Sequence, residues 1–149
     1  MSNLELRTDM KGNMTVKVYG PANVYPTACL GEGVQVGAFS EVGHNVIVCD
    51  RTKIGMGSFL CEGVKIGKDV FIGPRVVFTN DPFPPSTKEN WLDTIIEDNV
   101  AIGANATIKC GIRIGIGALI GCGSVVTKDI PAGETWCGNP AKKMDKPQS

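Results

Sequence analysis

Three side chains that can move protons or fix hydrogen bonds recur in this sequence at one spacing. His44, Glu62 and Asn80 follow one another at a constant 18-residue interval. An imidazole titrates near neutral pH, a carboxylate can stabilise the imidazolium, and a carboxamide both accepts and donates hydrogen bonds. In a fold with an 18-residue repeat the three groups would form one column. Such a column could hold a substrate by hydrogen bonds and take a proton from it.

Solvation alone could also make this position of a repeat polar. Glu32, Asp50 and Lys68 occupy the matching position on another edge and are well explained as side chains that point into water. Asn80, however, is the last residue before DPFPPSTKENW (residues 81–91), whose prolines and polar residues cannot continue a strand ladder. Three groups capable of proton or hydrogen-bond chemistry beside an interruption favour a functional site.

The elements that would place these side chains follow from a period of six. An apolar residue is followed four positions later by a small or β-branched one, and glycine often comes directly after the apolar residue, as tight bends would require. The apolar positions before the interruption are Val18, Val24, Leu30, Val36, Val42, Val48, Ile54, Leu60, Ile66, Ile72 and Phe78. The register resumes with Ile96, Ile102, Ile108, Ile114, Ile120 and Val126. A strict period of six fits neither a helix nor a lone strand, but it fits a short strand followed by a turn.

Three such units make an 18-residue coil, and coils stacked at the sheet spacing of about 4.8 Å bury the apolar column inside a prism. This pattern resembles the hexapeptide-repeat family. The resemblance implies an all-β fold, the left-handed parallel β-helix, and a homotrimer whose sites lie in clefts between neighbouring prisms.

The segments of one domain, residues 1–149, follow from where the period holds. We expect a flanking segment (1–17), coils (18–80 and 92–130), an extruded loop (81–91) and a C-terminal cap (131–149). If the loop residues are additional to the coils, Ile96 begins the face after that of Phe78, and Cys110 stacks above Asn80. If the loop instead consumes two repeats in phase, Asp98 takes that place. We prefer the first reading.

Three motifs resemble the nucleotide-linked amino-sugar N-acetyltransferases of that family, most of all the 3-amino-sugar branch. VFTND at residues 77–81 is similar to a motif that ends in a functional asparagine, and CEGV at 61–64 is similar to the family's acidic position. VYPTA at 24–28 is similar to the opening His-Pro-Thr-Ala signature, with Tyr25 in place of histidine.

The resemblance implies catalytic roles for the column. His44 is expected to act as the base, Glu62 to orient its ring and stabilise the imidazolium, and Asn80 to position the amine. The same three residues and Asp81 are expected to bind the substrate.

Two later segments, IGANATIKCG (102–111) and GSVVTKDIPAG (123–133), resemble the coenzyme-binding coils of the family. The implied co-substrate is acetyl-CoA. Its implied contacts are Gly103, Ala104, Cys110, Gly121, Cys122, Lys128 and Lys143. The basic tail at Lys142 and Lys143 either meets the coenzyme phosphates or is simply solvated.

The implied reaction is direct transfer of an acetyl group, in a ternary complex, to the amine of a nucleotide-linked amino-deoxy sugar, with dTDP or UDP as the expected nucleotide. Transfer to a sugar hydroxyl and transfer of a longer acyl chain are alternatives. The departing coenzyme thiolate or water could remove the proton instead of His44. Covalent catalysis through Cys110 is less favoured, because direct transfer needs no covalent intermediate.

Composition excludes several other classes of function. Lysine plus arginine and aspartate plus glutamate number 15 each, so no net charge favours nucleic acid or an anionic membrane. A zinc hydratase of the carbonic-anhydrase type needs three histidines, and the chain has one. The six cysteines form no C-x-x-C pair, and no apolar run is long enough to span a membrane. We therefore expect a cytoplasmic enzyme without a metal, and a purely structural β-helix would leave the column and the loop unexplained.

Overall fold

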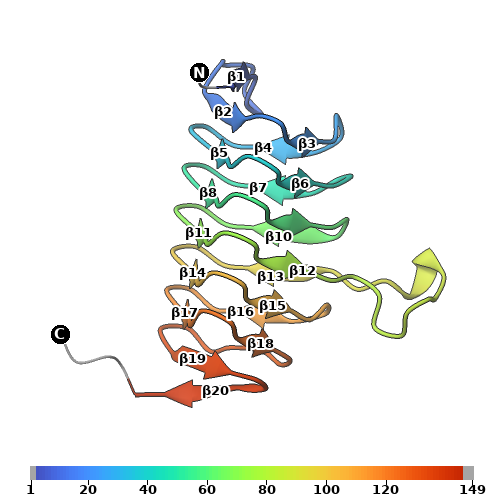
Figure 1. Cartoon of the computed structure of the whole chain (residues 1–149), viewed down its shortest axis with the longest axis vertical. Coiled ribbons are helices and arrows are strands. Elements are labelled where there is room, and N and C mark those ends of the chain that lie inside the picture. The colour runs from blue at the N-terminus through green and yellow to red at the C-terminus, as the bar shows by residue number, and fades with distance from the viewer. Residues whose placement is uncertain (1–2, 146–149) are drawn as a thin grey trace.

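In the computed structural model, which describes residues 3–145, the chain winds into a tall three-sided prism (Figure 1). Each coil passes through sheet A, then sheet B, then sheet C. Sheet A contains β1 (Leu4–Arg7), β2 (Val16–Tyr19), β5 (Gln35–Val36), β8 (Lys53–Ile54), β11 (Phe71–Ile72), β14 (Ala101–Ile102), β17 (Leu119–Ile120), β19 (Thr135–Gly138) and β20 (Ala141–Met144). Sheet B contains β3 (Asn23–Val24), β6 (Glu41–Val42), β9 (Phe59–Leu60), β12 (Val77–Phe78), β15 (Thr107–Ile108) and β18 (Val125–Val126). Sheet C contains β4 (Cys29–Leu30), β7 (Ile47–Val48), β10 (Val64–Ile66), β13 (Thr94–Ile96) and β16 (Arg113–Ile114). The predicted left-handed parallel β-helix is confirmed.

Strand pairing fixes the length of each coil and the phase of the loop. Val42 in β6 pairs in parallel with Leu60 in β9, which is the separation that an 18-residue coil requires. Across the interruption, Phe78 pairs with Ile108, a separation that exceeds one coil by about the length of the loop. The loop residues are therefore additional to the coil. The predicted stacking of Cys110 above Asn80 is confirmed, and the alternative with Asp98 in that place is wrong.

The prism interior holds the apolar column that the period of six predicts. Leu60, Ile72, Phe78 and Ile120 are completely buried. Buried hydroxyls of Ser40, Thr52, Ser58 and Ser124 at the small position donate to backbone carbonyls, as Ser58 Oγ does to the carbonyl of Gly73 at 3.0 Å. The hydroxyl of Thr94 is the exception and has no partner among residues 3–145. Serine and threonine are tolerated there because the turn supplies an acceptor.

Where a glycine directly follows the aliphatic residue, the neighbouring coil leaves little room for a side chain. A Cβ on Gly103 would lie 2.5 Å from the backbone nitrogen of Cys122 in the next coil. The left-handed backbone conformation occurs two residues further along each turn, where Asn45 (φ 57°) and Arg51 (φ 61°) adopt it. Close stacking of coils, rather than the conformation of the bend, therefore explains this glycine.

Antiparallel hairpins close both ends of the prism. At the N-terminal end β1 pairs with β2, and at the C-terminal end β19 pairs with β20. Ala141 in β20 is buried, and Trp136 in β19 packs against the core, so the last hairpin caps the open end of the coils. Between residues 3 and 145, no helix has the length and hydrophobicity that a membrane crossing requires.

Candidate functional site

The predicted column lines a small open pocket at the corner where sheet B turns into sheet C. His44, Glu62 and Asn80 each lie two residues after a strand of sheet B, namely β6, β9 and β12. The parallel registers of these strands stack the three residues on successive coils. All three line a pocket of about 190 Å³, together with Tyr25 and Trp91.

His44 is held by two residues of the preceding coil. The ring of Tyr25 stacks on the imidazole with centroids 4.1 Å apart and planes inclined by 3°. Thr27 Oγ1 lies 3.1 Å from His44 Nδ1 and also accepts a hydrogen bond from the Asn45 N–H at 3.1 Å. Since Nδ1 is engaged by Thr27, Nε2 is the ring nitrogen that a ligand can approach.

Glu62 joins the column to the loop. Its Oε1 lies 2.9 Å from Nζ of Lys88, which stands in the short 3₁₀ helix η1 (Lys88–Asn90), and Asn45 Nδ2 donates to the same oxygen at 3.4 Å. The hydrogen bond from Lys88 lowers the pKa of Glu62 below its usual value, with the Asn45 amide and the nearby His44 acting in the same direction. Glu62 is therefore a carboxylate at neutral pH.

Asn80 is the last of the three residues along the chain, and the loop leaves the prism directly after it. Its side-chain Nδ2 donates to the backbone carbonyl of Glu62 at 3.2 Å. Its backbone carbonyl accepts the Leu92 N–H at 2.9 Å, where the chain re-enters the prism. Among residues 3–145 no donor bonds to Asn80 Oδ1. That oxygen is placed to accept a hydrogen bond from an amine.

Asp81 organises the loop that leaves the prism (Figure 1). Its carboxylate accepts hydrogen bonds from the Phe83 N–H at 3.0 Å and from the Ser86 N–H and hydroxyl at 2.7 Å each. These bonds brace the first turn of the loop. The role of Asp81 in binding substrate stays a prediction.

The residues predicted to contact the coenzyme divide between two corners of the prism. Cys110 and Lys128 follow β15 and β18 and extend the His44 column beyond Asn80. The remaining turn residues stack at the corner between sheets A and B, after β14 and β17, and are Gly103, Ala104, Gly121 and Cys122. The two sets flank the outer face of sheet B, so a ligand touching both would have to cross that face.

The two lysines predicted to meet the coenzyme have partners in the C-terminal cap. Lys128 Nζ lies 5.6 Å from the centroid of the Trp136 ring, and Lys143 Nζ lies 3.2 Å from Glu134 Oε2. Hydrogen bonds from Trp136 and then Lys143 lower the pKa of Glu134 below its usual value. Binding of either lysine to a phosphate would therefore compete with a contact inside the cap.

Two cysteines beside the column are buried. Cys61, which lines the pocket, is 6% exposed, and burial raises its pKa to about 11, so the thiol is not ionised at neutral pH. Cys110 is 4% exposed. Within residues 3–145, no three histidine, cysteine, aspartate or glutamate side chains gather as they would around a metal ion.

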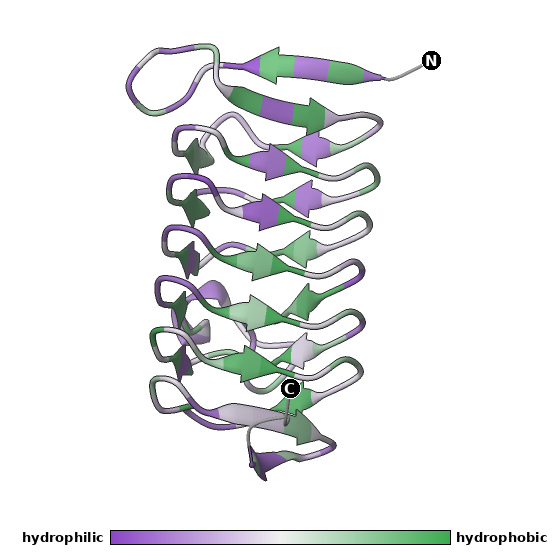
Figure 2. Cartoon of the chain, turned by 90° about the vertical axis from the view of Figure 1, so that its left-hand side faces the viewer, coloured by the Kyte–Doolittle hydropathy of each residue, from purple (hydrophilic) through white to green (hydrophobic). Residues whose placement is uncertain are grey.

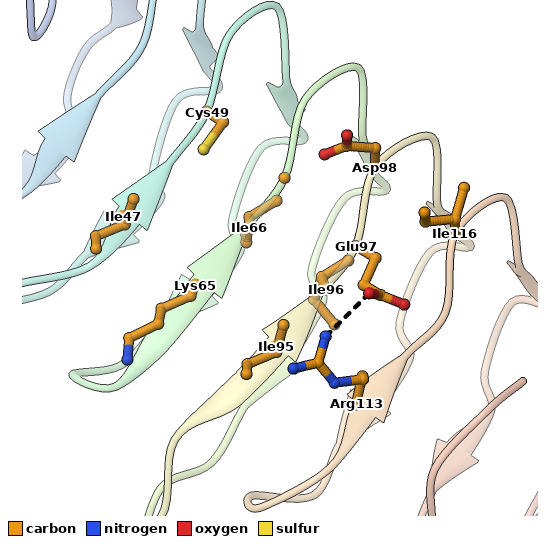
Figure 3. A pocket seen from close by; sticks show the side chains of 11 residues that line it. Ile47, Cys49, Lys65, Ile66, Ile95, Ile96, Glu97, Asp98, Arg113 and Ile116 are labelled. Atoms are coloured by element: carbon orange, nitrogen blue, oxygen red, sulfur yellow. Dashed lines mark hydrogen bonds and ion pairs between the residues drawn. The ribbon is translucent and has the colours of Figure 1, made fainter. Parts of the chain in front are cut away.

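A larger open groove of about 370 Å³ lies on sheet C, toward its corner with sheet A (Figure 3). Ile47 and Ile95 line it with aliphatic surface, and the ion pair between Arg113 and Glu97, 2.9 Å long, crosses its edge. This lining suits packing against another surface. The smaller pocket at His44 is the one that combines an imidazole, a carboxylate and an amide.

Two family models match the chain in its two runs of coils. The model of the bacterial transferase hexapeptide (six repeats) matches residues 30–62, and the model of the hexapeptide repeat of succinyl-transferase matches residues 93–128. These matches coincide with the 18-residue coils of the structure. The chain is a hexapeptide-repeat protein.

Among curated proteins, this hexapeptide-repeat protein is similar to 2,3,4,5-tetrahydropyridine-2,6-dicarboxylate N-acetyltransferase of Staphylococcus aureus. The two are 45% identical over 73 residues, which make up 49% of this chain and 29% of that protein. The chain thus covers less than a third of the length of the curated relatives that it matches.

Solved structures share the fold over most of this chain. A perosamine N-acetyltransferase from Caulobacter crescentus, solved with CoA and GDP-perosamine, has a TM-score of 0.78 and 24% identity, covering 88% of this chain and 57% of that one. The acetyltransferase domain of PglB from Neisseria gonorrhoeae, solved with acetyl coenzyme A, has a TM-score of 0.77 and 26% identity, covering 87% and 57%. The N-acyltransferase AntD from Bacillus cereus, as a variant solved with dTDP and coenzyme A, has a TM-score of 0.82 and 19% identity, covering 97% and 91%.

Three residues were not assigned to the site from the sequence, namely Tyr25, which lines the pocket, and Thr27 and Lys88, which contact His44 and Glu62. The 18-residue spacing, extended one coil toward the N-terminus, places Pro26 beneath His44, and this would have brought Tyr25 and Thr27 to either side of the ring. Lys88 could not be found in this way, because the loop has no period. Its position depends on how the loop folds back onto Glu62.

Proposed function

We propose that this hexapeptide-repeat protein is an acetyl-CoA-dependent N-acyltransferase that acts on the amino group of a nucleotide-linked amino-deoxy sugar. The observation that carries the proposal is the convergence of His44, Glu62 and Asn80 in one pocket beside the only loop between residues 18 and 130. Three solved structures with this fold were determined with CoA or acetyl-CoA, and one of them also with GDP-perosamine.

The proposed reaction joins the amine to the acetyl group in one complex. Asn80 Oδ1 accepts a hydrogen bond from the amine, and His44 Nε2 takes the proton that the nitrogen must lose. The nitrogen then attacks the thioester carbonyl carbon and the C–S bond breaks. The coenzyme leaves as a thiolate, which takes the second proton that the nitrogen loses as the amide forms. The ionised Glu62, on the next coil, stabilises the imidazolium of His44.

The coenzyme is proposed to follow the later coils away from Asn80, along the B–C corner and the outer face of sheet B. Cys110 and Lys128 extend the column in that direction, and Gly103 and Gly121 mark the other edge of sheet B. The buried, un-ionised thiol of Cys61 and the burial of Cys110 support direct transfer over a cysteine-bound intermediate.

A homotrimer belongs to the same proposal. Outward positions of sheets A and B are polar in the early coils and apolar in the middle and later ones (Figure 2). The exposed apolar side chains there are Phe59, Phe71, Val77 and Leu119. Phe59 also lines the His44 pocket, so a neighbouring prism on this surface would border the site.

A screen of coenzyme thiol release tests the proposed function. The purified protein should release CoA from acetyl-CoA with nucleotide-linked 3-amino or 4-amino sugars and not with the matching sugars that carry a hydroxyl. Equal release with the hydroxyl sugars would make O-acetylation the function. Butyryl-CoA and hydroxybutyryl-CoA in parallel reactions would define the acyl chain.

The curated relative justifies one further substrate in that screen. Because the Staphylococcus aureus protein is 45% identical over half of this chain, 2,3,4,5-tetrahydropyridine-2,6-dicarboxylate should be tested beside the sugars. Release of CoA with this dicarboxylate alone would keep N-acetylation and replace the sugar.

A further inference from the structure

The imidazole of His44 lies against two residues of the preceding coil, Tyr25 and Thr27, which together form its socket. Tyr25 and Thr27 are the two neighbours of Pro26, which the 18-residue register places directly under His44. Tyr25 covers a face of the ring, and Thr27 Oγ1 contacts Nδ1. Two independent contacts thus fix both the plane of the ring and its rotation.

We propose that Tyr25 and Thr27 are positioning residues for His44, and that Thr27 Oγ1 accepts the hydrogen bond from His44 Nδ1–H, so that the neutral ring presents an unprotonated Nε2 to the amine. The inference rests on the proposed function, in which His44 takes the proton of the amine. It adds the residues that make that nitrogen available.

Counting hydrogens shows why the direction of the Thr27 bond decides the chemistry. A threonine oxygen has two lone pairs and one hydrogen. The Asn45 N–H uses one lone pair, and the second is available to His44 Nδ1–H. Thr27 is exposed, so its own hydrogen can be donated to water. With the opposite direction, Thr27 would donate to Nδ1, the hydrogen of the ring would lie on Nε2, and no proton could be accepted there.

Proton transfer favours the arrangement in which Thr27 accepts from His44 Nδ1–H, because the hydrogen bond then need not reverse when the ring becomes charged. When the amine gives its proton to Nε2, the ring becomes an imidazolium in which both nitrogens are donors. Thr27 must then be an acceptor at Nδ1. If Thr27 already accepts from Nδ1–H in the neutral state, the same hydrogen bond persists and becomes charge-assisted, which strengthens it.

Tyr25 supports the same state of the ring. Its face lies parallel to the imidazole at 4.1 Å, within the range in which an aromatic face attracts a cation. The stack also hinders rotation of the ring about its Cβ–Cγ bond, and so fixes the direction in which Nε2 points. A flat aromatic residue is therefore needed at position 25, and the tyrosine hydroxyl is not.

The tautomer of His44 can be measured directly, because it is the only histidine of the chain. In ¹⁵N-labelled protein without an affinity tag, two-bond ¹H–¹⁵N correlations at a pH where the ring is neutral distinguish Nδ1–H from Nε2–H. The expected spectrum shows Nδ1–H. A spectrum dominated by Nε2–H overturns the inference.

Variants separate positioning from folding. Thr27→Val should abolish the preference for Nδ1–H and lower kcat about 10- to 100-fold with little change in the KM for acetyl-CoA, whereas Thr27→Ser should keep both. Tyr25→Leu should lower kcat over the same range, and Tyr25→Phe should not. Thr8→Val is the matched control, since Thr8 is an exposed threonine between β1 and β2 whose hydroxyl lies against Met14 Sδ and not against His44. An Nδ1–H spectrum in Thr27→Val equal to that of the wild type would overturn the role of Thr27.

The tautomer is read without substrate, so this test and that of the proposed function can fail separately. Nε2–H in a protein that acetylates an amino sugar would refute the socket and keep the function. Nδ1–H in a protein that releases no CoA with any amine would refute the function, while the hydrogen bond from Nδ1 to Thr27 would stand.

Discussion

A histidine on a solvent-facing turn means little by itself, and the neighbours of His44 are what give it a role. Lys88 lowers the pKa of Glu62, and Asn80 Nδ2 is tied to the backbone of the preceding coil, which leaves the amide oxygen without a hydrogen-bond partner among residues 3–145. Each residue of the column thus has at least one group engaged by the fold. In the proposed reaction the column supplies an acceptor for the proton, a carboxylate for the imidazolium and an acceptor for the amine.

Cysteine chemistry is testable at the same scale. Since Cys110 is buried and a direct transfer needs no covalent intermediate, Cys110→Ser should keep kcat within about threefold of the wild type. Cys61, whose pKa burial raises to about 11, should resist iodoacetamide at neutral pH, while the exposed Cys29 and Cys122 react. Peptide mass spectrometry and steady-state kinetics measure both. Loss of acyl transfer in Cys110→Ser with an unchanged fold would favour an acyl-cysteine intermediate.

The sequence identified the column but not its supports, for a physical reason. His44, Glu62 and Asn80 could be aligned because residues that are 18 apart in the sequence lie next to one another on stacked coils. Which side chains fill the space between coils depends on rotamers and on the turn geometry, so Thr27 emerged only from the structure. Lys88 lies outside the repeat altogether.

Among the elements, the coils were the predictable part and the loop was not. A period of six fixes which residues point inward, and pairing across the loop then follows from how many residues are additional. The loop's fold depends on the Asp81 turn and the ion pair between Lys88 and Glu62. The ion pair makes the loop part of the pocket, because it ties a segment outside the prism to the column.

Replacement of residues 81–90 by a short glycine linker should leave the prism folded, because that segment contributes no ladder strand. The KM of the nucleotide sugar should rise at least about tenfold, since Lys88 and the position of Trp91 would be lost. Circular dichroism and steady-state kinetics measure the two effects. Unchanged kinetic constants would make the loop a passive insertion.

Attachment of the loop should depend on pH through Glu62. The folded-state pKa of Glu62 is lowered by Lys88, so the ion pair persists through the ordinary range near 4.5 and is lost only as the pH falls through the lower folded-state value. In a Trp136→Phe background Trp91 is the only tryptophan, and its emission should shift to longer wavelength as the loop detaches.

Lys88→Met in the same background is the control for that titration. Its Trp91 emission should already be shifted at neutral pH and should lack the acid transition that Glu62 causes. The same acid transition in both proteins would show that Glu62 does not hold the loop through Lys88.

For the whole molecule, the shape of the prism explains what the proposed trimer would add to the site. A triangular solenoid has three flat faces and no deep cleft, and the His44 pocket is accordingly small and open, at about 190 Å³. Sheet B carries the exposed apolar side chains of Phe59, which lines the pocket, and Val77, and sheet A carries that of Phe71. A neighbouring prism on that surface would deepen the pocket into a cleft.

Sedimentation should give a mass three times that of the 15.8 kDa chain. Phe71→Glu, at a position that is 51% exposed, should dissociate the assembly and lower activity with it, because a buried charge at an apolar contact is unfavourable. Lys17→Glu, on the same sheet in the first coil, is the matched control and should remain trimeric. A monomer with full activity would contradict the shared cleft.

The measurement that tests the central claim most directly is the pH dependence of kcat for the wild type and His44→Ala, with acetyl-CoA and the amino sugar that the screen identifies. If His44 is the base, His44→Ala should lower kcat by about 10² to 10⁴ and remove the lower limb of the profile. Asn80→Ala should also raise the KM of the amine, and Glu62→Gln should have a smaller effect. Near-normal kcat and an unchanged profile in His44→Ala would contradict the account and make the departing coenzyme thiolate the acceptor of the proton.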